Sequence, residues 1–172
     1  MSTIEKIKEK LQDLRNGKPS IQFDPLWIKD RITQKTIDWS EDIGFLICDK
    51  QVFNKNGRDF EKNGGNSVTT SQIRNFFGEV KRIQMKLSGN EDNWQEVNSS
   101  FLLLKPKLNY MAARVLSKNS SSRIALLKDQ FEYMLAAIQV GPDYSQTVKE
   151  FIRFAELFEA ILAFHKSYGG KE

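Results

Sequence analysis

The sequence predicts an all-α protein, a compact single-domain bundle of five to six helices. Three observations favour this fold class. Apolar residues recur at helical spacing along most of the chain, β-branched residues are scattered, and no segment alternates as a half-buried strand would. The chain has 172 residues, 40% of them hydrophobic, which is enough for one core and short for two. We therefore expect a single helical domain over residues 1–172.

The N-terminal part of the chain predicts two helical regions. Ser2 and Glu5 have the spacing of a capping box, and apolar residues follow at helical intervals, so a first helix is expected over residues 2–16. Asp24-Pro25 is typical of a helix start, with proline in the first turn. The apolar pattern after it predicts helix through about residue 49, in one or two pieces.

The middle of the chain predicts a loop followed by a well-defined helix. Residues 54–68 are rich in asparagine and glycine, so we expect a mobile loop there. Thr69 or Thr70 then provides an N-cap, and Gln72 has the spacing of its capping-box partner. The helix that follows carries a continuous apolar stripe, formed by Ile73, Phe76, Phe77, Val80, Ile83 and Leu87.

The C-terminal half predicts further helices. Residues 94–104 remain ambiguous, although a separate helical turn is compatible with them, and Pro106 fits the first turn of a fresh helix. Helices are then expected over 122–140 and over 144–167. The last of these is apolar on more than one side, so it belongs in the bundle core or in an interface between copies. We expect the free protein to self-associate, most simply as a dimer.

Positive charge is concentrated in the middle third of the chain. The net charge is +4, but residues 69–128 carry ten Lys/Arg against four Asp/Glu, while residues 1–68 are nearly balanced and residues 129–172 are acidic. A local basic region is typical of proteins that bind polyanions. It is equally compatible with an ordinary solvated face, so charge alone leaves both interpretations open.

Four residues of the helix that contains Pro106 form one narrow stripe. At about 100° per residue, Lys107, Tyr110, Arg114 and Lys118 fall side by side along the edge of the apolar face. Cations follow phosphates and an aromatic ring can stack on a base, so the stripe favours binding of single-stranded RNA. The alternative is that the tyrosine is a core residue and the cations are its solvated rim.

Other cations extend the stripe onto the preceding helix. Arg74 and Lys81 are seven residues apart and so lie almost on one line along that helix. Contacts with backbone phosphates give affinity without sequence specificity, which suits a protein that tolerates any RNA sequence. The predicted RNA-binding residues are Arg74, Lys81, Lys105, Lys107, Tyr110, Arg114 and Lys118.

The sequence contains no set of residues typical of an enzyme. His165 is the only histidine, and we expect it to be a packed or capping residue. Cys48 lies in an apolar run and has no second thiol for a disulfide or a metal site. Gly64-Gly65 lacks the strand and helix that flank a phosphate-binding loop. We therefore expect a non-enzymatic protein without a cofactor or a metal site.

The sequence also predicts a soluble protein of the cytoplasm. No apolar run approaches the roughly 18 residues that a membrane-spanning helix needs. The N-terminus is charged and amphipathic, without the apolar segment of a secretion signal. The single cysteine is consistent with a reducing compartment.

Two segments of the chain resemble a known family. The strings TTSQIRNFFGEVKRI (69–83) and LKPKLNYMAAR (104–114) resemble the hallmark segments of the small subunit of type III-A CRISPR effector complexes, the Csm complex. The apolar IGFLI run (43–47) and the Phe-rich final helix are similar to that family's layout. The resemblance covers about residues 30–168 and does not extend to the N-terminal helix.

The resemblance implies a concrete function. Members of the family are compact helical bundles that stack in several copies beside the guide–target duplex, contact mainly the target RNA backbone, do not cut RNA, and act in antiviral defence. By that analogy Arg74, Lys81, Lys105, Lys107 and Arg114 would face RNA, and Tyr110 would be either a contact or a packing residue. The alternative is a helical adaptor that acts only in protein–protein assembly, with its basic face on an acidic partner.

Overall fold

In a computed structural model of the chain, the residues described are 5, 9, 10, 14, 18–48, 52–53, 60–61, 68–88, 93–116 and 122–169. The described helices are α2 (Leu26–Lys29), α3 (Gln34–Leu46), α4 (Thr70–Leu87), α5 (Trp94–Leu102), α6 (Leu104–Leu116), α7 (Ser122–Ala136) and α8 (Tyr144–Ser167). Six of them span nine residues or more and α2 is a single turn, so the predicted helical bundle is confirmed.

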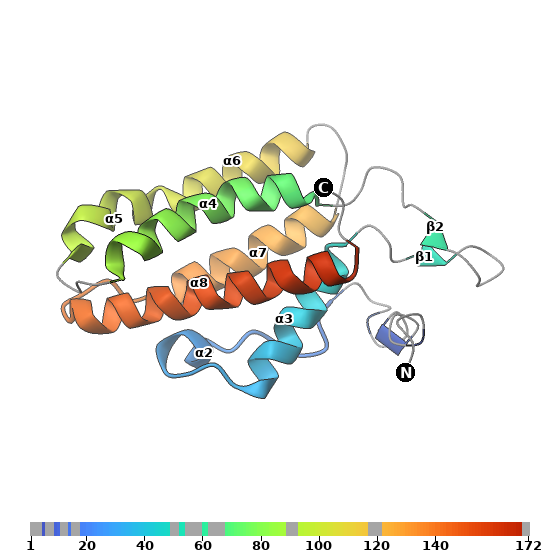
Figure 1. Cartoon of the computed structure of the whole chain (residues 1–172), viewed down its shortest axis with the longest axis horizontal. Helices are drawn as coiled ribbons and strands as arrows, with labels where there is room; N and C mark the ends of the chain where they lie inside the picture. The colour runs from blue at the N-terminus through green and yellow to red at the C-terminus, as the bar shows by residue number, and fades with distance from the viewer. Residues whose placement is uncertain are drawn as a thin grey trace.

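Helix α8 lies at the centre of the bundle. Figure 1 shows α4 and α6 on one side of α7 and α8, and α2 and α3 on the other. Helix α8 packs against α2, α3 and α4, and its Phe158 ring contacts Phe131 of α7 with 4.3 Å between ring centroids. Its buried apolar residues point in several directions: Val148, Phe151, Phe154, Ala155, Leu157, Phe158 and Ile161. The chain's own helices therefore cover the surface from which a dimer was inferred, and the dimer stays a prediction.

Helix α4 has the predicted beginning and end. The Thr69 side chain accepts a hydrogen bond from the Gln72 amide at 3.2 Å, and the Gln72 side chain accepts one from the Thr69 amide at 2.9 Å. These reciprocal bonds form a capping box and satisfy two amides that have no partner within the helix. The helix ends before Ser88, whose hydroxyl donates to the Gln84 carbonyl at 2.8 Å.

The region predicted as helix through about residue 49 is divided in two. Helix α2 ends at Lys29, and α3 begins at Gln34 with Thr33 as its N-cap in a second capping box. The side chain of Arg153 on α8 donates to the backbone carbonyls of Ile28 and Lys29, the latter at 2.7 Å. This guanidinium satisfies carbonyls at the end of α2 that have no partner within the helix.

One predicted helix end was wrong, and one predicted loop contains a short strand. Within the predicted loop at 54–68, β2 (Phe60–Glu61) pairs antiparallel with β1 (Val52–Phe53). Most of that segment lies outside the described residues, so the mobile loop stays a prediction. Helix α7 ends at Ala136 rather than 140. Beyond its end, the Gln139 amide donates to the Glu150 carboxylate at 2.7 Å, so a side chain of α8 takes the amide that a longer α7 would have used.

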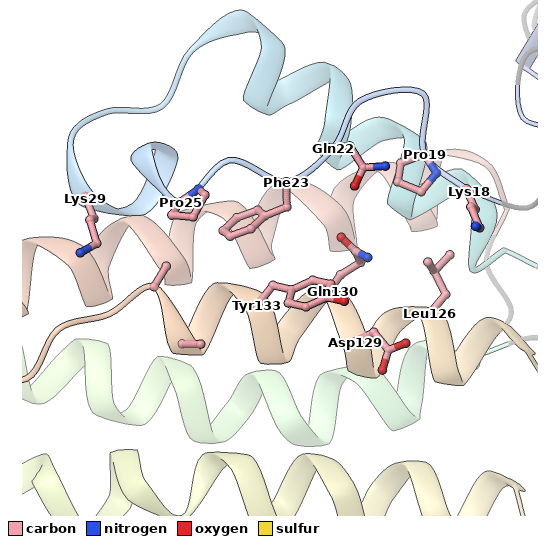
Figure 2. Close-up of a pocket in the computed structure, with 12 residues that line it drawn as sticks. Lys18, Pro19, Gln22, Phe23, Pro25, Lys29, Leu126, Asp129, Gln130 and Tyr133 are labelled. Carbon is pink, nitrogen blue, oxygen red and sulfur yellow. The ribbon is translucent and has the colours of Figure 1, made fainter.

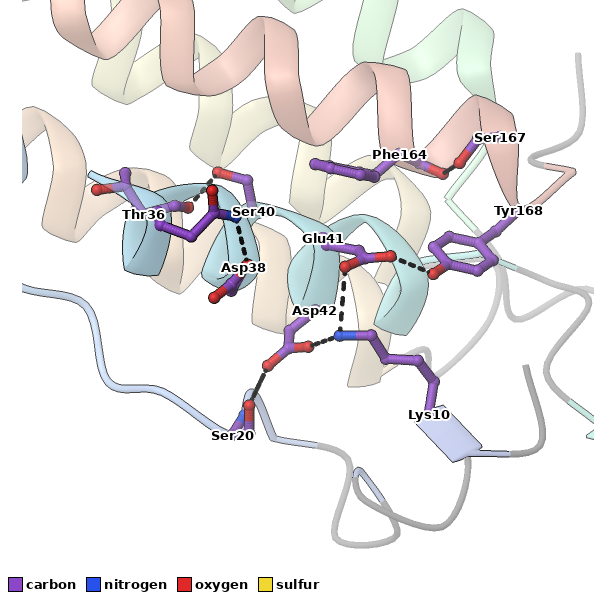
Figure 3. Close-up of polar contacts among 11 residues, drawn as sticks. Lys10, Ser20, Thr36, Asp38, Ser40, Glu41, Asp42, Phe164, Ser167 and Tyr168 are labelled. Carbon is purple, nitrogen blue, oxygen red and sulfur yellow. Dashed lines mark hydrogen bonds and ion pairs between the residues drawn. The ribbon is translucent and has the colours of Figure 1, made fainter. Parts of the chain in front are cut away.

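A group of hydrogen bonds and ion pairs joins the N-terminal segment to α3 and to the end of α8 (Figure 3). The carboxylate of Asp42 is buried and accepts hydrogen bonds from Lys10 and from the amide and hydroxyl of Ser20, the amide at 2.9 Å. The neighbouring Glu41 accepts one from the Tyr168 hydroxyl at 2.5 Å. Glu5, Glu9 and Lys10 have helical backbone; the rest of the predicted helix 2–16 lies outside the described residues.

Candidate nucleic-acid interface

Helices α4 and α6 lie side by side and turn their basic residues to the surface. Helix α4 buries its apolar stripe and leaves Arg74, Arg82 and Lys86 exposed. Helix α6 packs through Leu108 and Ala112, which are buried, while the residues turned away from the core are Lys105, Lys107, Tyr110 and Arg114. Together the two helices contain seven Lys/Arg and one acidic residue. We call this the α4–α6 basic surface, formed by Arg74, Lys81, Arg82, Lys86, Lys105, Lys107, Tyr110 and Arg114.

An ion pair joins the two helices across this surface. The Lys107 ammonium on α6 lies 2.7 Å from one carboxylate oxygen of Glu79 on α4. The other oxygen of Glu79 lies 2.7 Å from the Arg82 guanidinium. The hydrogen bond from Lys107, followed by that from Arg82, lowers the pKa of the Glu79 carboxyl. Glu79 therefore stays ionised at neutral pH and neutralises charge at the centre of the basic surface.

Lys81 is also engaged with other residues of the bundle. Its ammonium lies 2.8 Å from the Glu159 carboxylate on α8 and 5.2 Å from the centre of the Phe77 ring. The Lys81 side chain is 34% exposed, so one side of it remains open to solvent. Of the predicted cations, Arg74 and Lys105 have no described acidic partner, whereas Lys81 and Lys107 do.

Tyr110 lies on the surface and not in the core. Its residue exposure is 66%, and the Arg114 guanidinium carbon lies 5.8 Å from the centre of its ring. The sequence had left open whether this tyrosine packs inside the bundle. The structure answers that it does not, because α6 turns Leu108 and Ala112 inwards instead. An exposed ring beside a guanidinium offers a flat surface on which a base could stack.

The structure therefore places six of the seven predicted residues on α4 and α6, five of them exposed and Lys81 half-buried. The seventh, Lys118, lies outside the described residues. Arg82 and Lys86 belong to the same surface but were not predicted, although the helical period already put them on the solvent side of α4. Glu79 was missed as well. Its ion pair with Arg82 could have been predicted, since Arg82 follows it at the i,i+3 spacing of a helical ion pair, but its contact with Lys107 on the other helix could not.

A groove lies on the far side of α7 from the basic surface (Figure 2). It has a volume of about 910 Å³ and runs between residues 18–29 and α7. Phe23 and Tyr133 line its middle, and Lys18 and Lys29 lie toward its two ends. The lining includes one carboxylate, that of Asp129, and neither the single histidine nor the single cysteine of the chain.

The residues considered for chemistry from the sequence have structural roles. His165 is buried, with its Nε2 3.0 Å from the Val68 carbonyl oxygen. Cys48 is buried, and its thiol donates to the Tyr168 carbonyl at 3.2 Å. Among the described residues, no three His, Cys, Asp or Glu side chains are grouped so as to hold a metal ion. No helix in the described part of the chain has both the length and the apolar character needed to cross a membrane.

Comparison with known families decides the assignment. A family model described as Csm2 Type III-A matches residues 50–171. The chain belongs to the Csm2 family. Csm2 is a non-catalytic small-subunit family, so this chain is a structural subunit of the type III-A effector that assembles with other subunits of the Csm complex. Searches among curated proteins and among solved structures gave no match. The matched region contains the whole of the α4–α6 basic surface.

Proposed function

We propose that this Csm2 subunit binds the backbone of single-stranded target RNA through the α4–α6 basic surface. The most direct support is that two adjacent helices, α4 and α6, together carry seven Lys/Arg residues and an exposed tyrosine. Cations spaced along a surface follow phosphates and the ring stacks on a base, which is the usual chemistry of sequence-tolerant single-strand binding. The RNA-contacting residues are Arg74, Lys81, Lys105, Lys107, Tyr110, Arg114 and Lys118.

In this proposal the subunit is a cytoplasmic, non-catalytic part of the effector. Several copies stack beside the guide–target duplex, and each copy contacts a few phosphates of the target RNA. The complex as a whole acts in antiviral defence. Membership of the Csm2 family supports this role. Self-association of the free protein as a dimer belongs to the same proposal, and sedimentation at high protein concentration tests it: a strict monomer would exclude the dimer and leave the RNA contact unaffected.

The test is RNA binding by a variant without two of the cations. Because Glu79 contacts Lys107, a glutamate at 107 would meet a like charge, so neutral Lys107→Gln with Arg114→Gln is the cleaner change. Fluorescence anisotropy with single-stranded RNAs of unrelated sequence should show weaker binding of all of them alike. The slope of log affinity against log salt should become shallower by about 0.7 for each phosphate that the variant no longer neutralises.

A matched control removes two cations elsewhere. Lys29 and Lys149 are exposed and lie outside the α4–α6 basic surface, so Lys29→Gln with Lys149→Gln changes the net charge equally. This control should bind RNA as the unchanged protein does. Equal weakening in both double variants would mean that binding depends on overall charge. Unchanged binding in both would leave a protein-binding adaptor as the better account of the basic surface.

A further inference from the structure

Glu79 is the one acidic residue in α4 and α6, and it lies between cations of both helices. One of its oxygens accepts from Arg82 on its own helix and the other from Lys107 on the neighbouring helix, each at 2.7 Å. Two charge-assisted bonds to two separate cations are the arrangement in which a phosphate group would be held. The carboxylate therefore occupies, on this surface, the position suited to an RNA phosphate.

We propose that Glu79 is an internal competitor of RNA, a carboxylate that must release Lys107 and Arg82 before they bind phosphate, and that it holds the affinity of each subunit below what its cations would give. The inference rests on the proposed RNA-binding function. It assigns Glu79 a role in setting affinity without itself contacting RNA.

The surroundings of Glu79 favour competition over a role in holding the fold. Its side chain is 27% exposed and that of Lys107 is 45% exposed, so water screens the pair and its contribution to stability is small. Helices α4 and α6 are already joined in one apolar core, through residues such as Val80 and Leu108, both buried. Removing the Glu79 carboxylate should therefore leave the bundle folded and leave Lys107 and Arg82 free to bind phosphate.

A restrained single-site affinity suits a subunit that acts in several copies. Binding by linked copies adds up through effective concentration, so weak individual sites still give a tight array. A lone subunit with a carboxylate among its cations would hold stray RNA poorly. The lowered pKa of Glu79 agrees with this, since the competitor remains charged throughout the neutral range.

The experiment compares Glu79→Gln with a control of the same charge change. Asp129→Asn on α7 also removes one negative charge, and it lies in the groove of Figure 2. Anisotropy with a labelled single-stranded oligouridine RNA at about 50 mM salt should show roughly three- to tenfold tighter binding by Glu79→Gln and little change for Asp129→Asn. The salt slope of Glu79→Gln should be steeper by about 0.7 for each cation released.

A double variant tests whether the increase in RNA affinity depends on Lys107. Glu79→Gln should tighten binding much less in a Lys107→Gln background than in the unchanged protein, because one of the cations that it would release is then missing. An undiminished gain there, an equal gain for Asp129→Asn, or weaker binding by Glu79→Gln would each overturn the inference. Unchanged thermal melting of Glu79→Gln would confirm that the fold is not what changed.

Failure of the proposed function would look different. In that case the unchanged protein and Glu79→Gln would both fail to bind the RNA at low salt. Retention on heparin then tests the competition without RNA: Glu79→Gln should elute at higher salt than Asp129→Asn. Equal elution of the two would show that Glu79 does not restrain these cations toward a polyanion, and would overturn the inference on its own.

Discussion

Gly44 of α3 lies directly against the backbone of α8 at Ile161. A Cβ atom placed on Gly44 would lie 2.9 Å from the Ile161 carbonyl oxygen, and closer still to Phe164 and His165. Distances this short do not occur for real Cβ atoms, so the two helices could not cross this closely with any other residue there. The absence of a side chain at position 44 therefore sets how closely α3 approaches the central helix.

We expect Gly44→Ala to lower the free energy of unfolding by about 1–3 kcal/mol, the usual cost of overpacking a core. Gly78 provides the matched control, because a Cβ there would meet nothing within 4 Å. Gly78→Ala in the middle of α4 should raise stability by up to about 1 kcal/mol through helix propensity alone. Urea denaturation measures both variants; if Gly44→Ala is as stable as the unchanged protein, the close crossing is contradicted.

The buried carboxylate of Asp42 should be sensitive to neutralisation. Asparagine at this position would turn an amide group toward Lys10 or Ser20, which now donate to oxygen. We expect Asp42→Asn to cost about 1–3 kcal/mol, the range for leaving a buried polar group poorly matched. Asp38, one turn earlier, accepts a hydrogen bond from Gln34 at the surface, so Asp38→Asn should change stability by less than about 0.5 kcal/mol. Similar destabilisation of the two variants would argue against the buried contact.

Substitution of Tyr110 tests whether its ring stacks on an RNA base or packs within the bundle. Because its ring is exposed, Tyr110→Leu should leave the melting temperature unchanged. Removal of a stacking ring should weaken RNA binding by about 1–3 kcal/mol without altering the salt slope. The comparison is Tyr133→Leu, a change of another exposed tyrosine, which lies in the groove on the far side of α7; this variant should bind RNA normally. A lower melting temperature with intact binding would assign Tyr110 to packing.

Because of the Tyr168 hydroxyl, we expect the protein to become less stable at alkaline pH. Burial, followed by the hydrogen bond to Glu41 and the charge of that residue, raises the pKa of this phenol well above its usual value near 10. A group whose pKa is raised by folding stabilises the protein fully below its unfolded pKa and less as the pH climbs above it. The melting temperature should therefore fall more steeply above about pH 10 in the unchanged protein than in Tyr168→Phe. Equal steepness would contradict the assignment.

The parts of the fold that could be predicted are those determined by neighbouring residues. Both ends of α4 follow from local chemistry, with the Thr69 capping box at one end and Ser88 at the other. The end of α7 could not be predicted, because the deciding group is Glu150 on the following helix. The pairing of strands β1 and β2 was missed because each is only two residues long, too short for an alternating pattern to show.

In the candidate site, too, some features could be predicted from neighbouring residues and others could not. Its cations could be found from charge and helical period, since both are read along one helix. Whether Tyr110 is exposed depends on which face α6 turns to α4 and α7, and that face is determined only when the helices pack. The contact between Glu79 and Lys107 joins residues 28 positions apart on different helices. No local pattern contains that information.

The central position of α8 has a consequence for synthesis of the protein. It follows every other described helix in the chain, so α3 and α4 leave the ribosome before the helix around which they pack. Until α8 is made, the apolar faces of the earlier helices have no complete core to enter, and such surfaces promote aggregation. The bundle should therefore complete its folding only once α8 has been made, and chains interrupted before residue 144 should depend on chaperones or be degraded.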